Sequence, residues 1–399
     1  MLKIKNFYIF ILVTSAIWGS TLQFFYIPGV GSVYPLRIIL IFFFIYGLLN
    51  LFAGGGYIDK TSFRSMTNIR LWVFWLWILI LTIIRTKTAN TNSAFVTYTM
   101  NLLLIACVPA SLKDEEDERI ALKTIIFNSI FQGVLATYES VMGIWLFRSN
   151  ALSKWDMNSY GMVTPVTIFY NTNNLCMFIV LSLPAFFMLF KNTIVRILYF
   201  LFVICISILT SCRTGLASAI LFVLIILSIR VIKDGRVKVC VFFVFVLAAL
   251  VYVARDNILL TNERLLLWGN TLYNCYLDKF IGVGTGNAIV SISGNIMNIV
   301  YSAYGNVIYA VHNYLFELLL ETGIVGVVIV GTWFISVFKK VWNYRIADRG
   351  MYYFITIILL CLTSICVSTM TDFFQYWLYL GLLVAYVSNK ETDKDFDII

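Results

Sequence analysis

Apolar residues occur in long runs along this chain, and short polar linkers separate the runs. The hydrocarbon core of a bilayer is about 30 Å thick, so a helix that crosses it needs about 20 apolar residues. This template predicts twelve spans, at residues 7–26, 35–53, 71–86, 94–111, 121–147, 173–190, 194–211, 214–230, 237–254, 313–338, 351–370 and 373–388. We therefore predict an all-α polytopic membrane protein in which residues 1–399 form a single integral membrane domain. An even number of spans places both termini on the same side.

Two linkers are much longer than the others, at residues 148–172 and 255–312. We expect the second, between the ninth and tenth spans, to be a large outer loop, and long loops in compact proteins usually carry function. Within it, apolar and aromatic residues recur at near-helical spacing over 264–276 and 297–309. We predict short amphipathic helices in these two segments, lying at the outer membrane interface.

Composition strengthens the membrane prediction and assigns an orientation. The chain is 61% hydrophobic and 12% charged, whereas soluble domains carry roughly 25% charged residues. Lys and Arg number 29 against 20 Asp and Glu, and most of these basic residues fall in alternate linkers, starting with Lys3 and Lys5. This positive-inside distribution predicts a multi-pass protein of the cytoplasmic (inner) membrane with both termini cytoplasmic. It makes the lipid bilayer, rather than nucleic acid, the expected partner.

His312 is the only histidine in the chain, and it stands where the large outer loop enters the tenth span. Histidine is the side chain whose ordinary pKa lies closest to neutrality, which makes His312 a candidate for proton chemistry. Glu317 and Glu321 follow on one face of the same span, about 8 and 14 Å deeper. A helix cap for His312, and structural ion pairs for the two acids, are the alternative interpretations. One histidine without a spaced Cys or Asp cluster offers too few ligands for a metal, so we expect neither a metal nor another cofactor.

Two arginines on the predicted outer side could bind an anion. Arg213 lies in the short turn 210–215, and Arg264 stands four residues before Trp268 on a predicted helix. A guanidinium group suits phosphate or diphosphate oxygens. The alternatives are an arginine that only marks the interface and an amphipathic helix with an aromatic anchor. The glycine run at 282–287 has no preceding strand and no following Lys-Ser/Thr, so it predicts close backbone approach rather than a nucleotide site.

Four motifs occur in order in the second half of the chain. They are Ser211-Cys-Arg213-Thr-Gly215, Glu263-Arg264 with Trp268, Phe280-Ile-Gly282-Val-Gly284-Thr-Gly286-Asn287, and His312-Asn313 with Glu317, Glu321, Gly323 and Gly326. Together they resemble the O-antigen ligase/polymerase superfamily. The resemblance is concentrated in residues 205–330; the N-terminal half matches only in the spacing of its apolar runs. Cys212 departs from the small or polar residue common at that position.

The resemblance implies a membrane-embedded, C-type glycosyltransferase that works without metal on undecaprenyl-diphosphate-linked glycans at the outer face of the membrane. It implies that Arg213 and Arg264 hold the diphosphate and that His312 is catalytic. We assign Glu317 as a second catalytic residue, since Glu317 or Glu321 could orient His312 or stabilise its protonated form. We add Arg255 as a third outer cation for the diphosphate. The supporting residues that we assign are Asn313, Glu321, Lys279, Gly284 and Gly286.

Three functions remain open at this stage. A polysaccharide polymerase joins lipid-linked repeat units and could work with a chain-length regulator, whereas an O-antigen ligase transfers the glycan to lipid A–core. The Phe-, Ile-, Asn- and Lys-rich composition suggests an AT-rich genome with capsule or exopolysaccharide genes, which favours the polymerase. A polysaccharide transporter or flippase would be expected to show repeated halves and ionisable groups near the midplane. Here the sequence shows no repeat, and the charged residues within or beside the spans gather in the outer third of the membrane.

Overall fold

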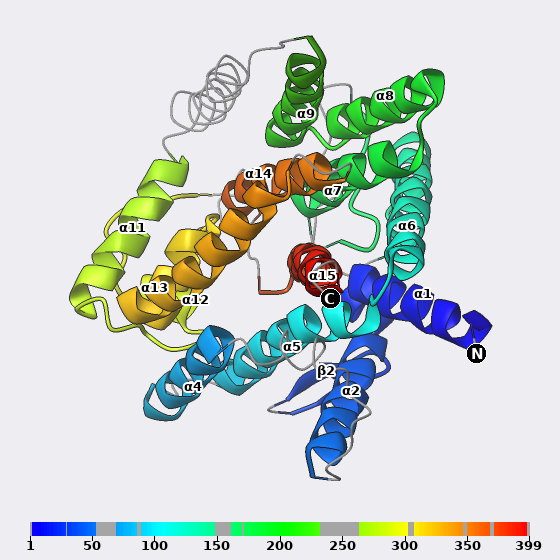
Figure 1. Cartoon of the computed structure of the whole chain (residues 1–399). Coiled ribbons are helices and arrows are strands. Elements are labelled where there is room, and N and C mark those ends of the chain that lie inside the picture. The colour runs from blue at the N-terminus through cyan, green and yellow to red at the C-terminus, as the bar shows by residue number, and fades with distance from the viewer. Residues whose placement is uncertain are drawn as a thin grey trace.

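The computed structural model describes residues 2–28, 30–52, 69–85, 89–147, 161–169, 171–231, 263–301, 307–345, 349–367 and 371–396. These residues form a bundle of helices, which confirms the predicted all-α class (Figure 1). The helices are α1 (Leu2–Trp18), α2 (Pro35–Phe52), α4 (Ile69–Ile84), α5 (Ala89–Ser111), α6 (Glu115–Met142), α7 (Thr172–Leu189), α8 (Thr193–Leu209), α9 (Arg213–Val231), α11 (Glu263–Leu277), α12 (Ala288–Gly294), α13 (Tyr314–Asn343), α14 (Gly350–Cys366) and α15 (Phe374–Phe396).

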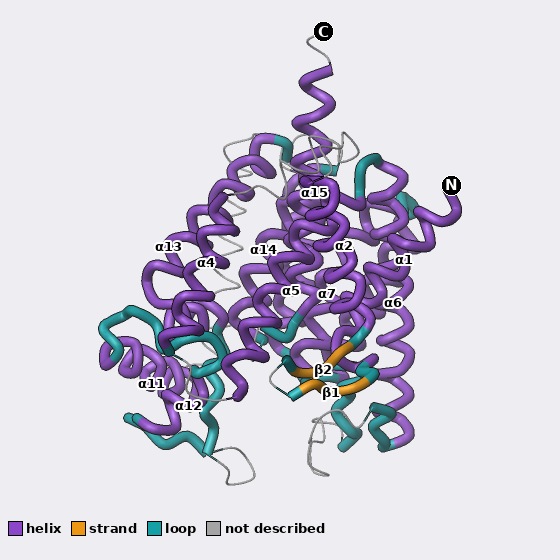
Figure 2. The backbone as a smooth tube through the Cα atoms, turned by 90° about the horizontal axis from the view of Figure 1, so that it is seen from below, coloured by secondary structure: helices purple, strands orange, loops and turns teal. Residues whose placement is uncertain are grey.

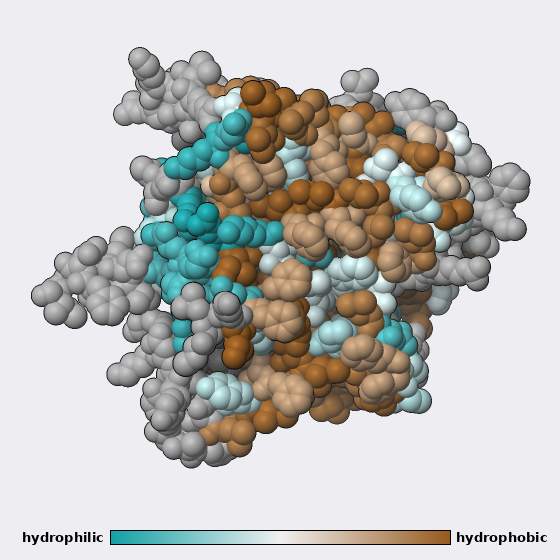
Figure 3. Space-filling model, turned by 90° about the vertical axis from the view of Figure 1, so that its right-hand side faces the viewer, coloured by the Kyte–Doolittle hydropathy of each residue, from teal (hydrophilic) through white to brown (hydrophobic). Residues whose placement is uncertain are grey.

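A helix occupies every predicted span that falls in the described residues, while the ninth, 237–254, lies outside them. Among the residues that the structure describes, four helices are long and apolar enough to cross a membrane, in α5, α6, α7 and α13. Shorter apolar helices lie in α1, α2, α4, α8, α9 and α14. Figure 3 shows a broad hydrophobic surface on one side of the bundle, with hydrophilic residues gathered at one edge. The chain is therefore a helical membrane protein.

Two of the predicted helical segments were wrong. The first span was expected to run to residue 26, but α1 ends at Trp18 and the chain then forms a hairpin of β1 (Phe25–Ile27) and β2 (Gly31–Val33). Gly19 has φ +50, outside the helical range, which ends the helix. The aromatic and β-branched residues that looked like a membrane span favour the hairpin strands.

The second error concerns 297–309. Its described residues form no helix; Tyr301 and Val307 make an antiparallel bridge. The short helix lies earlier, in α12. The helix predicted over 264–276 is confirmed as α11.

The two ends of the bundle differ. Both termini lie at one end, whereas the hairpin, α11 and α12 lie at the other (Figure 2). The termini end is closed by ion pairs between helices: Lys5 with Asp117 at 2.6 Å, Arg349 with Glu118 at 3.4 Å, and Lys340 with Glu391 at 2.8 Å. Helix α15 lies at the centre of the bundle in Figure 1 and packs against α5, α1 and α13. Its C-terminal turns extend beyond the other helices at the termini end (Figure 2).

Helices α11 and α12 form a small lobe on the N-terminal turns of α13. A separate cluster of buried residues holds it together: Cys275, Val283, Ala288, Ile292, Val311 and Leu320. We call residues 263–301 the outer lobe. Because Leu320 belongs to α13, this small core ties the lobe directly to that helix.

Candidate functional site

His312 is held just before the first turn of α13. Asn313 is the N-cap of that helix, and its side-chain Oδ1 accepts hydrogen bonds from the backbone N–H groups of Leu315 (3.0 Å) and Phe316 (3.3 Å). This cap explains why the helix begins here. His312 itself has φ +51, a left-handed conformation that is uncommon for residues other than glycine. Such strained positions gather at functional sites and persist only when their surroundings fix them.

The imidazole of His312 is electrically neutral in the unliganded protein. Burial, and then the positive charge of Arg264, lower its pKa to about 4. Both causes disfavour the protonated form. Its Nδ1 atom is buried and has no hydrogen-bond partner within the part of the chain that the structure describes. A neutral imidazole with an unused ring nitrogen is able to accept a proton.

Arg264 reaches from α11 to the end of α14. Its Nη1 donates a hydrogen bond to the backbone carbonyl of Ile365 at 3.1 Å. On the same helix, Trp268 packs against Phe316 of α13 with ring centroids 5.5 Å apart. These contacts place the guanidinium group where its charge acts on His312. The structure thus brings together two residues that are 48 positions apart in the sequence.

The turn that carries Arg213 meets the same end of α14. Arg213 is the exposed first residue of α9. The preceding Cys212 is buried, with its Sγ atom 3.8 Å from that of Cys366, the residue after Ile365. The end of α14 is therefore a common contact for Arg264 and for the Arg213 turn. Its terminal carbonyl groups carry partial negative charge, which favours cations nearby.

Glu321 forms a hydrogen bond with the glycine loop, as we call residues 280–287. Its side chain is buried; one oxygen accepts from the backbone N–H of Gly286 at 2.9 Å, and the other accepts from the Tyr98 hydroxyl at 2.9 Å. Glu317 is also buried, one turn nearer to His312, and interacts electrostatically with Glu321. With both of its oxygens engaged in this way, Glu321 supports the loop rather than His312.

The glycine loop passes through a break in α13. Gly323 has φ 69 and ψ −175, so the helix is interrupted there. Loop backbone bridges the break, because Val283 N–H donates to Leu320 C=O (2.9 Å), Gly284 N–H donates to Glu321 C=O (3.0 Å), and Phe280 C=O accepts from Ile324 N–H (3.0 Å). A Cβ atom on Gly282 would lie 2.7 Å from Gly323 N. The predicted close approach of backbone at these glycines is confirmed.

Neighbouring helices secure the same loop. Asp278 forms an ion pair with Arg85 at 3.1 Å and accepts from the N–H of Gly282 at 2.7 Å. Trp77 Nε1 donates to Thr322 C=O at 2.7 Å, which satisfies a carbonyl freed by the helix break. These partners were not predicted, because Trp77 and Tyr98 lie within apolar runs of the sequence. Arg85 and Asp278 were visible only as isolated charges at span ends.

Two other predicted site residues do not join this cluster. Lys279 is exposed, with φ +53, in the turn after α11. Arg264 stands at the opposite end of that 15-residue helix, about 20 Å away along its axis. Arg255 lies outside the described residues. Among the described residues, no three His, Cys, Asp or Glu side chains are grouped so as to hold a metal ion.

Comparison with other proteins adds no assignment: no family model matches the chain, and no curated protein matches it. The functional inference rests on the residues gathered around the end of α14.

Proposed function

We propose that this protein is a polysaccharide polymerase that joins undecaprenyl-diphosphate-linked repeat units. The observation that carries the proposal is that Arg264 acts electrostatically on neutral His312 and also contacts the end of α14, where the turn that carries Arg213 lies. A base beside one permanent cation, with a second arginine in a turn that meets the same helix end, suits a reaction in which a hydroxyl attacks and a diphosphate leaves. The ordered motifs that resemble the O-antigen ligase/polymerase superfamily point to the same chemistry.

In the proposed reaction the acceptor sugar hydroxyl attacks the anomeric carbon of the donor glycan. The bond from that carbon to the diphosphate oxygen breaks, and its electron pair leaves on the lipid diphosphate. Arg213 and Arg264 stabilise the negative charge that develops there, which is where a metal would otherwise act. The hydroxyl proton passes to His312 and then to solvent.

The low pKa of His312 fits a site that is completed by its substrate. In the unliganded protein the charge of Arg264 opposes protonation of His312. A bound diphosphate offsets that charge and raises the pKa of His312 toward its ordinary value. His312 thereby becomes a stronger base only when the donor is in place.

We place the outer lobe on the outer face of the cytoplasmic membrane and both termini in the cytoplasm. The support is the concentration of Lys and Arg in the linkers on the termini side. Lipid-linked repeat units would then meet His312 from the outer leaflet.

The test is elongation of lipid-linked repeat units by the purified protein in liposomes, without added metal or nucleotide. We expect His312→Ala to reduce the rate by about 10²- to 10⁴-fold, the usual contribution of a general base, and Arg213→Ala to weaken donor use strongly. The matched control is Arg119→Ala, an exposed arginine near the start of α6 at the termini end.

Undiminished chain length with both site variants would contradict the proposal. Transfer of the glycan to lipid A–core, but not to a second repeat unit, would make the protein a ligase. Movement of the intact lipid-linked glycan across the bilayer without any new glycosidic bond would make it a flippase.

A further inference from the structure

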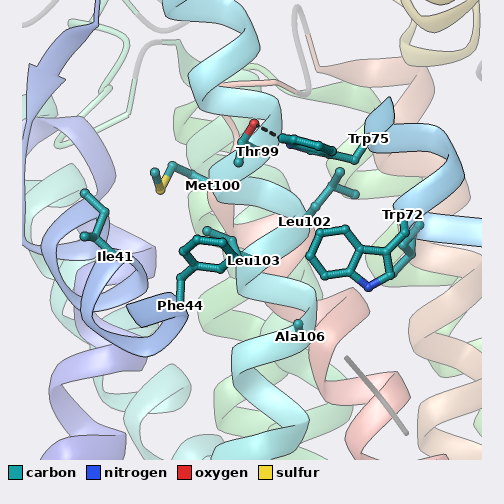
Figure 4. A pocket seen from close by; sticks show the side chains of 10 residues that line it. Ile41, Phe44, Trp72, Trp75, Thr99, Met100, Leu102, Leu103 and Ala106 are labelled. Carbon is teal, nitrogen blue, oxygen red and sulfur yellow. Dashed lines mark hydrogen bonds between the residues drawn. The ribbon is translucent and has the colours of Figure 1, made fainter. Parts of the chain in front are cut away.

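An apolar cavity lies between α2, α4 and α5, away from the His312 site. Its volume is about 310 Å³, within the range of about 300–1,000 Å³ found for small-molecule sites. Figure 4 shows side chains from the three helices around it, among them Ile41 and Phe44 of α2, Trp72 of α4, and Leu103 of α5. The cavity therefore lies between helices from one region of the chain, residues 35–111, and is partly open to the surface.

The cavity offers little to a polar ligand. Thr99 is the one hydroxyl-bearing residue of its lining, and this hydroxyl donates to Phe95 C=O at 2.9 Å and accepts from Trp75 Nε1 at 3.1 Å. Both polar groups are thus satisfied by the protein itself. The other lining side chains are hydrocarbon, thioether or aromatic, as shown in Figure 4. Such a surface suits a hydrocarbon chain.

The shape of the cavity sets the direction of that chain. On α5 its lining runs from Thr99 to Ala106, which spans about 10 Å along the helix axis. Ala106 lies nearer the end of α5 that leads to the termini end of the bundle, and Leu71 and Trp72 lie close to the start of α4 at that same end. The cavity therefore extends from the termini side toward the middle of the membrane.

Basic residues mark the end from which a lipid would enter. Arg70 directly precedes the lining residues Leu71 and Trp72 and is exposed. The linker before α4 adds Lys60 and Arg64 by sequence. Basic clusters beside a membrane helix attract anionic lipid headgroups. The apolar lining suits an acyl chain and the basic residues suit an anionic headgroup, so both features favour an anionic phospholipid.

We propose that the cavity between α2, α4 and α5 binds one acyl chain of an anionic phospholipid, whose phosphate lies on the basic side near Arg70. This site belongs to the leaflet on the side of the termini. It does not depend on the proposed glycosyltransfer reaction.

Native mass spectrometry of the purified full-length protein tests the proposal, with phosphatidylglycerol and phosphatidylcholine as probes. We expect one phosphatidylglycerol to survive detergent exchange on the wild-type protein, with at least fivefold less phosphatidylcholine retained. Ala106→Trp fills the cavity and should abolish this retention. Ile45→Trp introduces the same side chain on the exposed side of α2, outside the cavity lining, and should keep this retention.

Arg70→Gln tests the contribution of the lipid headgroup separately from that of the acyl chain. This variant should still bind a phospholipid but should lose most of the preference for phosphatidylglycerol. Gel filtration and thermal unfolding confirm that each variant is folded before its lipids are counted; if Ala106→Trp does not fold, Leu103→Trp takes its place. Equal retention by the cavity variant and the wild type would overturn the proposal, as would a polyprenyl lipid, or equal amounts of both phospholipids, on the wild-type protein.

Discussion

At the scale of single residues, His312 combines an unusual backbone conformation with an unusually low pKa. Its φ of +51 is fixed between buried Val311 and the N-cap Asn313. Its pKa of about 4 reflects burial and the nearby Arg264. The sequence does not predict the low pKa, because it depends on burial and on the tertiary packing that brings Arg264 of α11 close to His312.

The low pKa of His312 predicts the pH dependence of elongation. Below its pKa, His312 is protonated and unable to accept a proton, so kcat/KM should fall only as the pH drops toward about 4. Arg264→Gln removes the repelling charge and should move this acidic limb to higher pH, although the overall rate falls. The measurement is kcat/KM from pH 4 to 8 for both proteins. An acidic limb near 6.5 in the wild type, unchanged in the variant, would contradict the assignment.

At the scale of elements, α13 illustrates what hydrophobic patterning predicts and what it misses. The apolar run predicted the helix, and the glycines predicted close backbone approach. The break at Gly323 was not predicted, because the residues around it are as apolar as those of an unbroken span. Its cause is tertiary: Leu320 C=O, Glu321 C=O and Ile324 N–H find their partners in the glycine loop.

The helix break predicts a sharp difference between glycines. Gly282 has φ +111, and an added Cβ atom would meet the backbone of α13 at 2.7 Å. Gly282→Ala should therefore destabilise the protein by about 2 kcal/mol or more, from backbone strain together with the clash. Gly294 lies in α12 with open space around its added Cβ atom, and Gly294→Ala should be neutral or stabilising by up to about 1 kcal/mol. Thermal unfolding in one detergent compares them. An equal loss of thermal stability in both variants would contradict the backbone strain and clash that we assign to Gly282→Ala.

Other elements show the limits of sequence patterns in the same way. Five consecutive acidic residues at 114–118 are a pattern typical of a solvated helix start, and Asp114 is indeed the N-cap of α6. Yet Asp117 and Glu118 are buried, because Lys5 and Arg349 come from distant helices to pair with them. Periodicity predicts which residues form a helix, whereas these partners depend on how the helices assemble.

At the scale of the whole molecule, the arrangement of the two ends predicts a specific labelling pattern. Gly294 in the outer lobe and Arg119 near the start of α6 lie at opposite ends of the bundle. Gly294→Cys should react with a membrane-impermeant maleimide in intact cells, because we place the lobe outside. Arg119→Cys should react only after permeabilisation. The unsubstituted protein gives the background from its native thiols, and the reverse pattern would invert the proposed orientation.

The loop that crosses α13 also has a mechanical consequence. Hydrogen bonds on both sides of Gly323 join loop residues 280–284 to the helix above and below its break. The loop therefore joins the two parts of α13 rigidly, and the interruption at Gly323 does not act as a hinge. The outer lobe and the N-terminal turns of α13 therefore form one rigid unit. A tilt of α11 would shift Arg264 and His312 together, so that the pair would keep its spacing.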